Sequence, residues 1–162
     1  MDILHYQQEF LNYLQSKKWI KDPKNLYEPI DYILHLGGKR MRPILTLMAA
    51  DIFSSNYKKA LPAALAVEVF HNFTLVHDDI MDDAPLRRGK ATVHEKWDIS
   101  TGILSGDAML ILAYQYFENY EPIIFQKLAK LFSKTALEVC DGQQLDVDFE
   151  TRKDVTIDEY IN

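Results

Sequence analysis

Apolar residues recur every three or four positions along nearly the whole chain, and this spacing is the feature that most constrains the fold. Such a spacing places them on one face of an α-helix, whereas half-buried strands show strict alternation of apolar and polar residues, which is missing here. The sequence therefore predicts an all-α protein. Helices are expected at residues 3–14, 27–36, 44–53, 61–82, 92–98, 102–119 and 122–149.

Local signals support several of these helix ends. Gly37 and Gly38 are typical of a helix C-terminus, and Pro43 suits the first turn of the next helix, which is apolar on most sides and is expected to be buried. Thr156 and Glu159 form a capping-box pattern that predicts a helix beginning at Ile157. Because only a few residues follow, this segment is either a docked or frayed terminus or the start of a helix in a larger fold.

Composition narrows the class of protein. The 162 residues suggest one domain, and a net charge of −6 argues against a general nucleic-acid binder. No apolar stretch is long enough to span a membrane. The single cysteine, Cys140, cannot form an internal disulfide, and the N-terminus does not resemble a signal peptide, so we expect a cytoplasmic protein.

Four aspartates, Asp78, Asp79, Asp82 and Asp83, lie at the end of the helix expected at 61–82. A helix C-terminus carries partial negative charge, so these acids repel both the helix dipole and one another. Asp78 and Asp82 share a helix face and could hold Mg²⁺. A solvated acidic helix end is the alternative, although the preceding segment is apolar enough to be core; a calcium loop fits poorly, because its sixth position requires glycine.

Two groups of cations flank this acidic cluster. Lys39, Arg40 and Arg42 precede a helix N-terminus, an arrangement that favours phosphate binding, although Lys39 and Arg40 could instead complement the dipole of the preceding helix. Arg87 and Arg88 follow the aspartates; alone they would be typical of a charged surface pair.

His71 falls on the helix face that carries Asp78 and Asp82, although a histidine among apolar residues is more often part of the core. Together, acids for Mg²⁺ and cations for phosphate predict a site for diphosphates, and the apolar segment before Asp78 suggests that their tails are apolar.

These motifs resemble, in order and spacing, the first-half signature of the trans-isoprenyl diphosphate synthases, or polyprenyl synthetases. The matching blocks are Gly37–Pro43, Asp78–Asp82 and Arg87–Gly89, and Gly106–Asp107 and Gly142–Gln143 with Asp146 resemble further motifs, so the similarity covers residues 25–162. The resemblance implies an isoprenoid synthase-type helical bundle, of which residues 1–162 would be the N-terminal half. It also implies a homodimer that condenses isopentenyl diphosphate with dimethylallyl, geranyl or farnesyl diphosphate.

The resemblance also implies a role for each matching residue. Asp78 and Asp82 would hold Mg²⁺ on the allylic diphosphate, and Arg87 would contact the same diphosphate. The residues that would bind isopentenyl diphosphate are Lys39, Arg42, His71 and Arg88. Gln143 and Asp146 would lie near the reacting carbons, while Asp79 and Asp83 would shape the electrostatic field.

Phe73 and Thr74 would set the product length. Phe73 precedes Asp78 by about one and a half helical turns, or roughly 7 Å. The resemblance implies that its ring forms the floor of the elongation pocket and limits the product to about C15–C20. The alternative is that Phe73 is ordinary core.

The sequence departs from the family in length. Family members are about twice as long and carry a second aspartate-rich motif, which does not occur after residue 83 and for which Asp146 and Asp148 do not substitute. We therefore expect the N-terminal half of a synthase, weakly active or inactive alone. A non-catalytic prenyl-diphosphate-binding subunit is the main alternative; a terpene cyclase would not need the second set of cations, and a purely structural helical protein would leave acids and cations unexplained.

Overall fold

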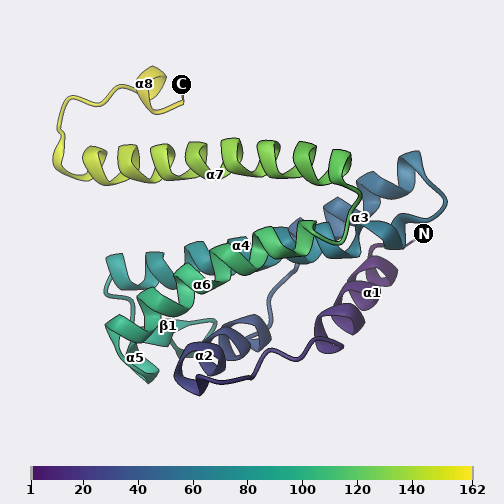
Figure 1. Ribbon diagram of the computed structural model, residues 1–162. Coiled ribbons are helices and arrows are strands. Elements are labelled where there is room, and N and C mark those ends of the chain that lie inside the picture. Colours follow the sequence, from purple (N-terminus) through teal and green to yellow (C-terminus); the bar gives the residue numbers. More distant parts are fainter. Residues whose placement is uncertain (1, 162) are drawn as a thin grey trace. The chain divides into compact units, whose positions relative to one another are not determined.

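The computed structural model describes residues 2–161, and nearly all of its regular structure is helical (Figure 1). The helices are α1 (Ile3–Gln15), α2 (Lys24–His35), α3 (Met41–Phe53), the short 3₁₀ helix η1 (Tyr57–Ala60), α4 (Leu61–Met81), α5 (Val93–Lys96), α6 (Ile99–Phe117), α7 (Pro122–Thr151) and α8 (Ile157–Ile161). The all-α prediction is confirmed. The chain divides into two compact units, residues 1–119 and 120–162.

The core of the first unit is built around α4, which packs mainly against α6 and also against α3. Close approach of α4 and α6 depends on two glycines. A Cβ atom added to Gly102 would lie 2.9 Å from Cδ1 of Ile80, and one added to Gly106 would lie 2.3 Å from Nε2 of His77. These contacts show that α6 runs antiparallel to α4, so the acidic end of α4 lies beside the beginning of α6.

Helix α4 ends within the aspartate cluster, after Met81. Asp82 takes the C-cap position, and Asp83 adopts a left-handed conformation with φ of 48°. The backbone N–H groups of Asp83 and Ala84 donate to carbonyls of the last helical turn, at 3.3 and 2.9 Å. The aspartates therefore stand on a well-defined helix end rather than on a loose loop.

A two-stranded hairpin follows α4 and was not expected from the sequence. Strand β1 (Leu86–Arg87) pairs antiparallel with β2 (Lys90–Ala91). Arg88 and Gly89 form the turn, with φ of 54° and 75°, as tight hairpin turns require. Strands of two residues are too short to show alternation, so the sequence carries no periodic signal for them.

The expectation that α3 is buried on most sides is wrong. Its buried residues are Pro43, Ile44 and Leu47, whereas Ile52 is 76% exposed and Phe53 is 89% exposed. The helix contacts α1, α4 and η1, and these contacts leave most of its apolar residues at least partly exposed. An apolar composition therefore overstated its burial.

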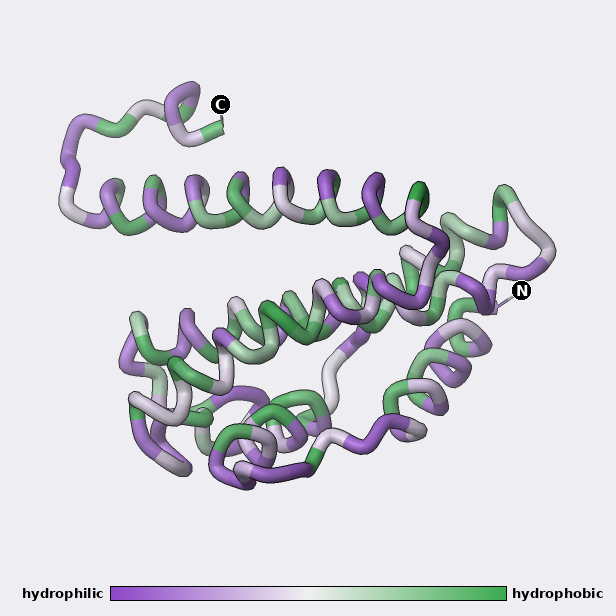
Figure 2. The backbone as a smooth tube through the Cα atoms, viewed as in Figure 1, coloured by the Kyte–Doolittle hydropathy of each residue, from purple (hydrophilic) through white to green (hydrophobic). Residues whose placement is uncertain are grey.

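The second unit consists of α7 and α8 and the segment between them. Figure 2 shows hydrophilic and hydrophobic positions mixed along α7, whose one buried residue is Phe132. Helix α8 begins at Ile157 as predicted, and the backbone N–H of Glu159 donates to Oγ1 of Thr156 at 3.2 Å. Among residues 2–161, no helix combines the length and hydrophobicity that crossing a membrane would require.

Candidate functional site

The turn between α2 and α3 positions the first group of cations. Helix α2 ends at His35, and Gly37 and Gly38 follow with φ of 86° and 121°, conformations that favour glycine. Arg40 then adopts φ of 53° immediately before α3. The predicted helix end at the glycine pair is confirmed, and the turn brings Arg40 and Arg42 to Glu68 and His71 of α4.

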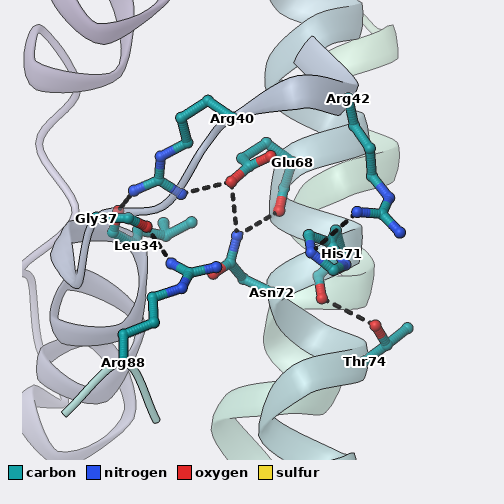
Figure 3. Close-up of polar contacts among 9 residues, drawn as sticks. All are labelled: Leu34, Gly37, Arg40, Arg42, Glu68, His71, Asn72, Thr74 and Arg88. Carbon is teal, nitrogen blue, oxygen red and sulfur yellow. Dashed lines mark hydrogen bonds and ion pairs between the residues drawn. The ribbon is translucent and has the colours of Figure 1, made fainter. Parts of the chain in front are cut away.

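Arg40 points inward from this turn (Figure 3). It is 5% exposed, and its guanidinium donates to the carboxylate of Glu68 and to the backbone carbonyl of Leu34. For Arg40, the interpretation as a complement to the end of the preceding helix is therefore correct. Its charge is neutralised largely by Glu68 rather than held free for a ligand.

Arg40 and the other cations line a pocket of about 430 Å³. Its lining residues are Gly38, Lys39, Arg40, Met41, Arg42, Glu68, His71 and Arg88. The pocket thus brings together four residues that the sequence had suggested for phosphate binding, namely Lys39, Arg42, His71 and Arg88. Glu68 is its single acidic lining residue.

His71 lies against Arg42 on the wall of this pocket. Nη1 of Arg42 is 3.2 Å from Nε2 of His71 (Figure 3). Burial lowers the pKa of His71, and the nearby Arg42 lowers it further, while Glu68 acts in the opposite direction. A neutral imidazole can accept a hydrogen bond from Arg42, so the geometry and the pKa shift agree.

Arg88 reaches the pocket from the hairpin turn. Its guanidinium donates to the carbonyl of Gly37 (Figure 3) and lies so close to Gly38 that an added Cβ would be 2.8 Å from Cζ. Burial and the nearby Arg40 lower the pKa of Arg88. A side chain at position 38 would therefore displace Arg88 from the pocket.

The four aspartates differ in environment. Asp79 is buried and accepts hydrogen bonds from Nε of Arg87 at 2.8 and 2.9 Å, so the protein itself neutralises this carboxylate. Asp78 is partly buried, whereas Asp82 and Asp83 are exposed. Burial, followed by repulsion from Asp82, raises the pKa of Asp78. A cation at Asp78 and Asp82 would relieve that repulsion.

The carboxylates of Asp78 and Asp82 suit a Mg²⁺ ion whose remaining coordination positions are filled by a bound ligand and water. Among the described residues, no group of three or more His, Cys, Asp or Glu side chains is arranged to hold a metal ion. Mg²⁺ in phosphate-transferring sites commonly takes only one or two carboxylates, with phosphate oxygens and water completing its octahedron. Asp78 and Asp82 fit that pattern, and the pairing with Arg87 leaves Asp79 less suited to it.

Phe73 and Thr74 lie on α4 before the aspartates. The Phe73 ring is partly buried and contacts His77 with 4.8 Å between ring centroids. Thr74 donates to the backbone carbonyl of His71 at 2.9 Å. Gln143 and Asp146 lie on α7 in the second unit.

Glu68 was not among the site residues expected from the sequence, yet it carries a buried hydrogen-bond network in the lining of the pocket. Asn72 donates to both the carboxylate and the backbone carbonyl of Glu68. The available signal was the presence of an acid within an apolar helical segment. Such an acid is expected to be buried, and buried carboxylates are nearly always paired. The partner, Arg40, could not be identified from spacing, since it lies on another element.

Comparison with known proteins assigns the chain to a family. A family model described as "Polyprenyl synthetase" matches residues 23–162. The chain belongs to this family. It is 47% identical to the geranylgeranyl diphosphate synthase of Methanosarcina mazei over 141 residues, a match that covers 86% of this chain and 44% of that enzyme. A second relative, the geranylgeranyl diphosphate synthase of Saccharolobus solfataricus, is 38% identical and matches 99% of this chain and 50% of its own length.

Solved structures show the same fold. A crystal structure of a geranylgeranyl pyrophosphate synthase is 60% identical, with a TM-score of 0.96 over 99% of this chain and 49% of that one. The geranylgeranyl pyrophosphate synthetase of Geoglobus acetivorans gives a TM-score of 0.84 at 37% identity, over 98% of this chain and 51% of that one. The resemblance and the isoprenoid synthase-type helical fold are confirmed. The chain spans about half the length of these polyprenyl synthetases.

Proposed function

We propose that this polyprenyl synthetase chain carries the substrate-binding portion of a prenyltransferase. The reaction condenses isopentenyl diphosphate with an allylic diphosphate and releases diphosphate. The observation that carries the proposal is the pocket that gathers Lys39, Arg42, His71 and Arg88 on one side of α4, whose end bears Asp78 and Asp82. One helix thereby connects a cationic site to an acidic site, as two diphosphate substrates require.

The cationic pocket would bind isopentenyl diphosphate. Lys39, Arg42 and Arg88 supply charged donors, and charge-assisted hydrogen bonds to phosphate are stronger and shorter than neutral ones. Binding there would leave the hydrocarbon end free to face the second substrate. The role of these residues is to fix the orientation of the nucleophilic double bond.

The aspartate end of α4 would bind the allylic diphosphate with Mg²⁺. Asp78 and Asp82 would hold the ion, which supplies neutralisation of the departing diphosphate. Arg87, held by Asp79, would contact the same leaving group. The C1–O bond of the allylic substrate breaks, C4 of isopentenyl diphosphate forms a bond to C1, and C2 of the former isopentenyl unit loses a proton to restore a double bond.

A short product, about C15–C20, follows from a bulky residue below the aspartates. Phe73 contacts His77, which in turn lies against Gly106 of α6, so the ring is supported from the neighbouring helix. In this proposal Phe73 and Thr74 form the floor that stops elongation. A cytoplasmic location, a homodimeric state and the positions of Gln143 and Asp146 beside the reacting carbons stay predictions.

The second candidate is a prenyl-diphosphate-binding subunit without catalytic activity of its own. Such a subunit would use the same residues, because binding at the pocket and at Asp78 and Asp82 does not itself require turnover. Mixing the chain with a catalytic subunit separates the two: activity gained only on mixing supports a partner subunit, and turnover by the chain alone supports the enzyme.

Titration with farnesyl thiodiphosphate, with Mg²⁺ or with EDTA, tests the binding function directly. We expect binding that requires Mg²⁺ and is lost in Asp78→Ala. Asp83→Asn is the matched control, because Asp83 is exposed and asparagine tolerates its left-handed backbone. Binding that ignores Mg²⁺, or that survives in Asp78→Ala, would contradict the proposed site.

A further inference from the structure

A buried ion pair forms part of the lining of the cationic pocket. The side chains of Arg40 and Glu68 are 2% and 3% exposed and contact each other directly. Asn72, one turn further along α4, donates to Oε1 of Glu68 at 3.2 Å (Figure 3). Donors from two elements thus converge on Oε1 of Glu68, and the buried charge is paired with that of Arg40, as burial requires.

Arg40 connects this carboxylate to the turn that forms the pocket. Its guanidinium also donates to the carbonyl of Leu34 in the last turn of α2, and its backbone holds φ of 53°. A left-handed conformation is unfavourable for a residue that carries a side chain, so it persists where surrounding contacts hold it. Glu68 and Leu34 supply those contacts.

The position of Arg40 determines where its neighbours project. Lys39 and Arg42 flank it in the chain and line the same pocket, while Arg40 turns inward. If Arg40 lost its anchor, the backbone turn would relax, and both neighbouring cations would move. The buried pair therefore couples α4 to the two residues of this turn best placed to meet a ligand.

Simple electrostatics gives Glu68 the wrong sign for an anion site. A carboxylate in the lining repels a diphosphate, and removing that charge alone would leave its partner Arg40 positive and more attractive to an anion. A field effect alone would therefore make Glu68 unfavourable. Its presence calls for another contribution that outweighs this repulsion.

We propose that Glu68 is a positioning residue, which holds Arg40 in its left-handed conformation and thereby places Lys39 and Arg42 for binding a diphosphate. This inference rests on the proposed function of the pocket. It predicts that removing the negative charge of Glu68 weakens anion binding, which is opposite in sign to the effect of the charge alone.

The first test is calorimetric titration of inorganic diphosphate in the presence of EDTA. Removing divalent cations means that the measured binding comes from the cationic pocket and not from the metal site. Glu68→Gln should raise the Kd about tenfold. Glu95→Gln removes an equal charge from an exposed position on α5 and should leave the Kd unchanged. A purely structural role would lower the unfolding temperature of Glu68→Gln without changing the Kd of the folded protein.

The second test uses Arg40→Lys, which keeps the positive charge and cannot bridge Glu68 and Leu34 with a planar fork. It should weaken binding about as much as Glu68→Gln, and the double variant should bind no more weakly than either single variant. Additive losses would overturn the coupling. Unchanged or tighter binding by folded Glu68→Gln would overturn the proposal itself.

Asn72→Ala keeps the test decisive if Glu68→Gln does not fold. This change removes one donor to Glu68 and leaves both charges in place, so a rise of about threefold in the Kd supports positioning and an unchanged Kd overturns it. Failure of the parent protein to bind diphosphate would overturn the proposed function of the pocket, and with it the site that Glu68 serves.

Discussion

Arg87 binds the buried carboxylate of Asp79, with Nη2 of the arginine 2.7 Å from Oδ1 of the aspartate. The contact joins strand β1 to the last turn of α4, and it is reinforced because Nε donates to both carboxylate oxygens. The hydrogen bond that Arg87 donates to Asp79, together with the negative charge of that carboxylate, raises the pKa of Arg87 against the opposing effect of burial. One of the four aspartates is therefore structural, and its partner is held close to the other acids.

Asp79→Asn should lower the free energy of unfolding by about 2–3 kcal/mol. This value lies between those of exposed pairs and fully buried pairs, because Arg87 keeps about a quarter of its side-chain surface exposed, at 24%. Urea denaturation at pH 7 measures the loss. Asp83→Asn removes a neighbouring exposed charge, and an equal loss in that variant would show that the Arg87 contact is not the cause.

Helix positions were predictable because their signals are local. The apolar spacing placed α4 at residues 61–82, within one residue of its observed end at Met81, and the Thr156–Glu159 pattern placed the start of α8. The glycine pair after α2 was predictable for the same reason. The β1–β2 hairpin was not, because two-residue strands have no period.

Site residues were predictable as types but not as partners. Chain position placed Lys39 and Arg42 in one group of cations and Arg88 in another, and only the family resemblance joined the three, which the structure brings into one pocket. The spacing of residues in the sequence could not show that Arg40 turns inward or that Arg87 pairs with Asp79, because both contacts join elements that are separate in sequence. Such pairings depend on tertiary packing.

Gly106→Ala should destabilise the first unit by about 1–3 kcal/mol, the usual cost of overpacking. The new Cβ would lie 2.3 Å from Nε2 of His77, so the imidazole must leave its position 3.2 Å from the carbonyl of Ile103. His77→Ala removes the obstructing ring. The double variant should therefore lose less stability by chemical denaturation than the two single losses added together, and strict additivity would contradict this explanation.

Phe73→Ala should lengthen the prenyl product if Phe73 forms the floor of the elongation pocket. Removing the ring opens space below Asp78 and removes the contact with His77. Chromatography of dephosphorylated products, in an assay with detectable turnover, gives the chain length. Phe53→Ala is the matched control, because this phenylalanine is 89% exposed on α3. A product of unchanged length from Phe73→Ala would show that Phe73 is an ordinary core residue.

The lowered pKa of His71 should make stability depend on pH through this residue. Burial and Arg42 hold its folded-state pKa below the ordinary value of about 6.5, so the unfolded chain takes up a proton first as the pH falls. The free energy of unfolding should therefore decrease below about pH 6.5, by up to about 1.4 kcal/mol per pH unit from this group, until its folded-state pKa is reached. His71→Gln cannot titrate and should lose less stability between pH 7.5 and 5.5 in urea denaturation. Parallel losses in the parent and the variant would show that His71 is not the titrating group.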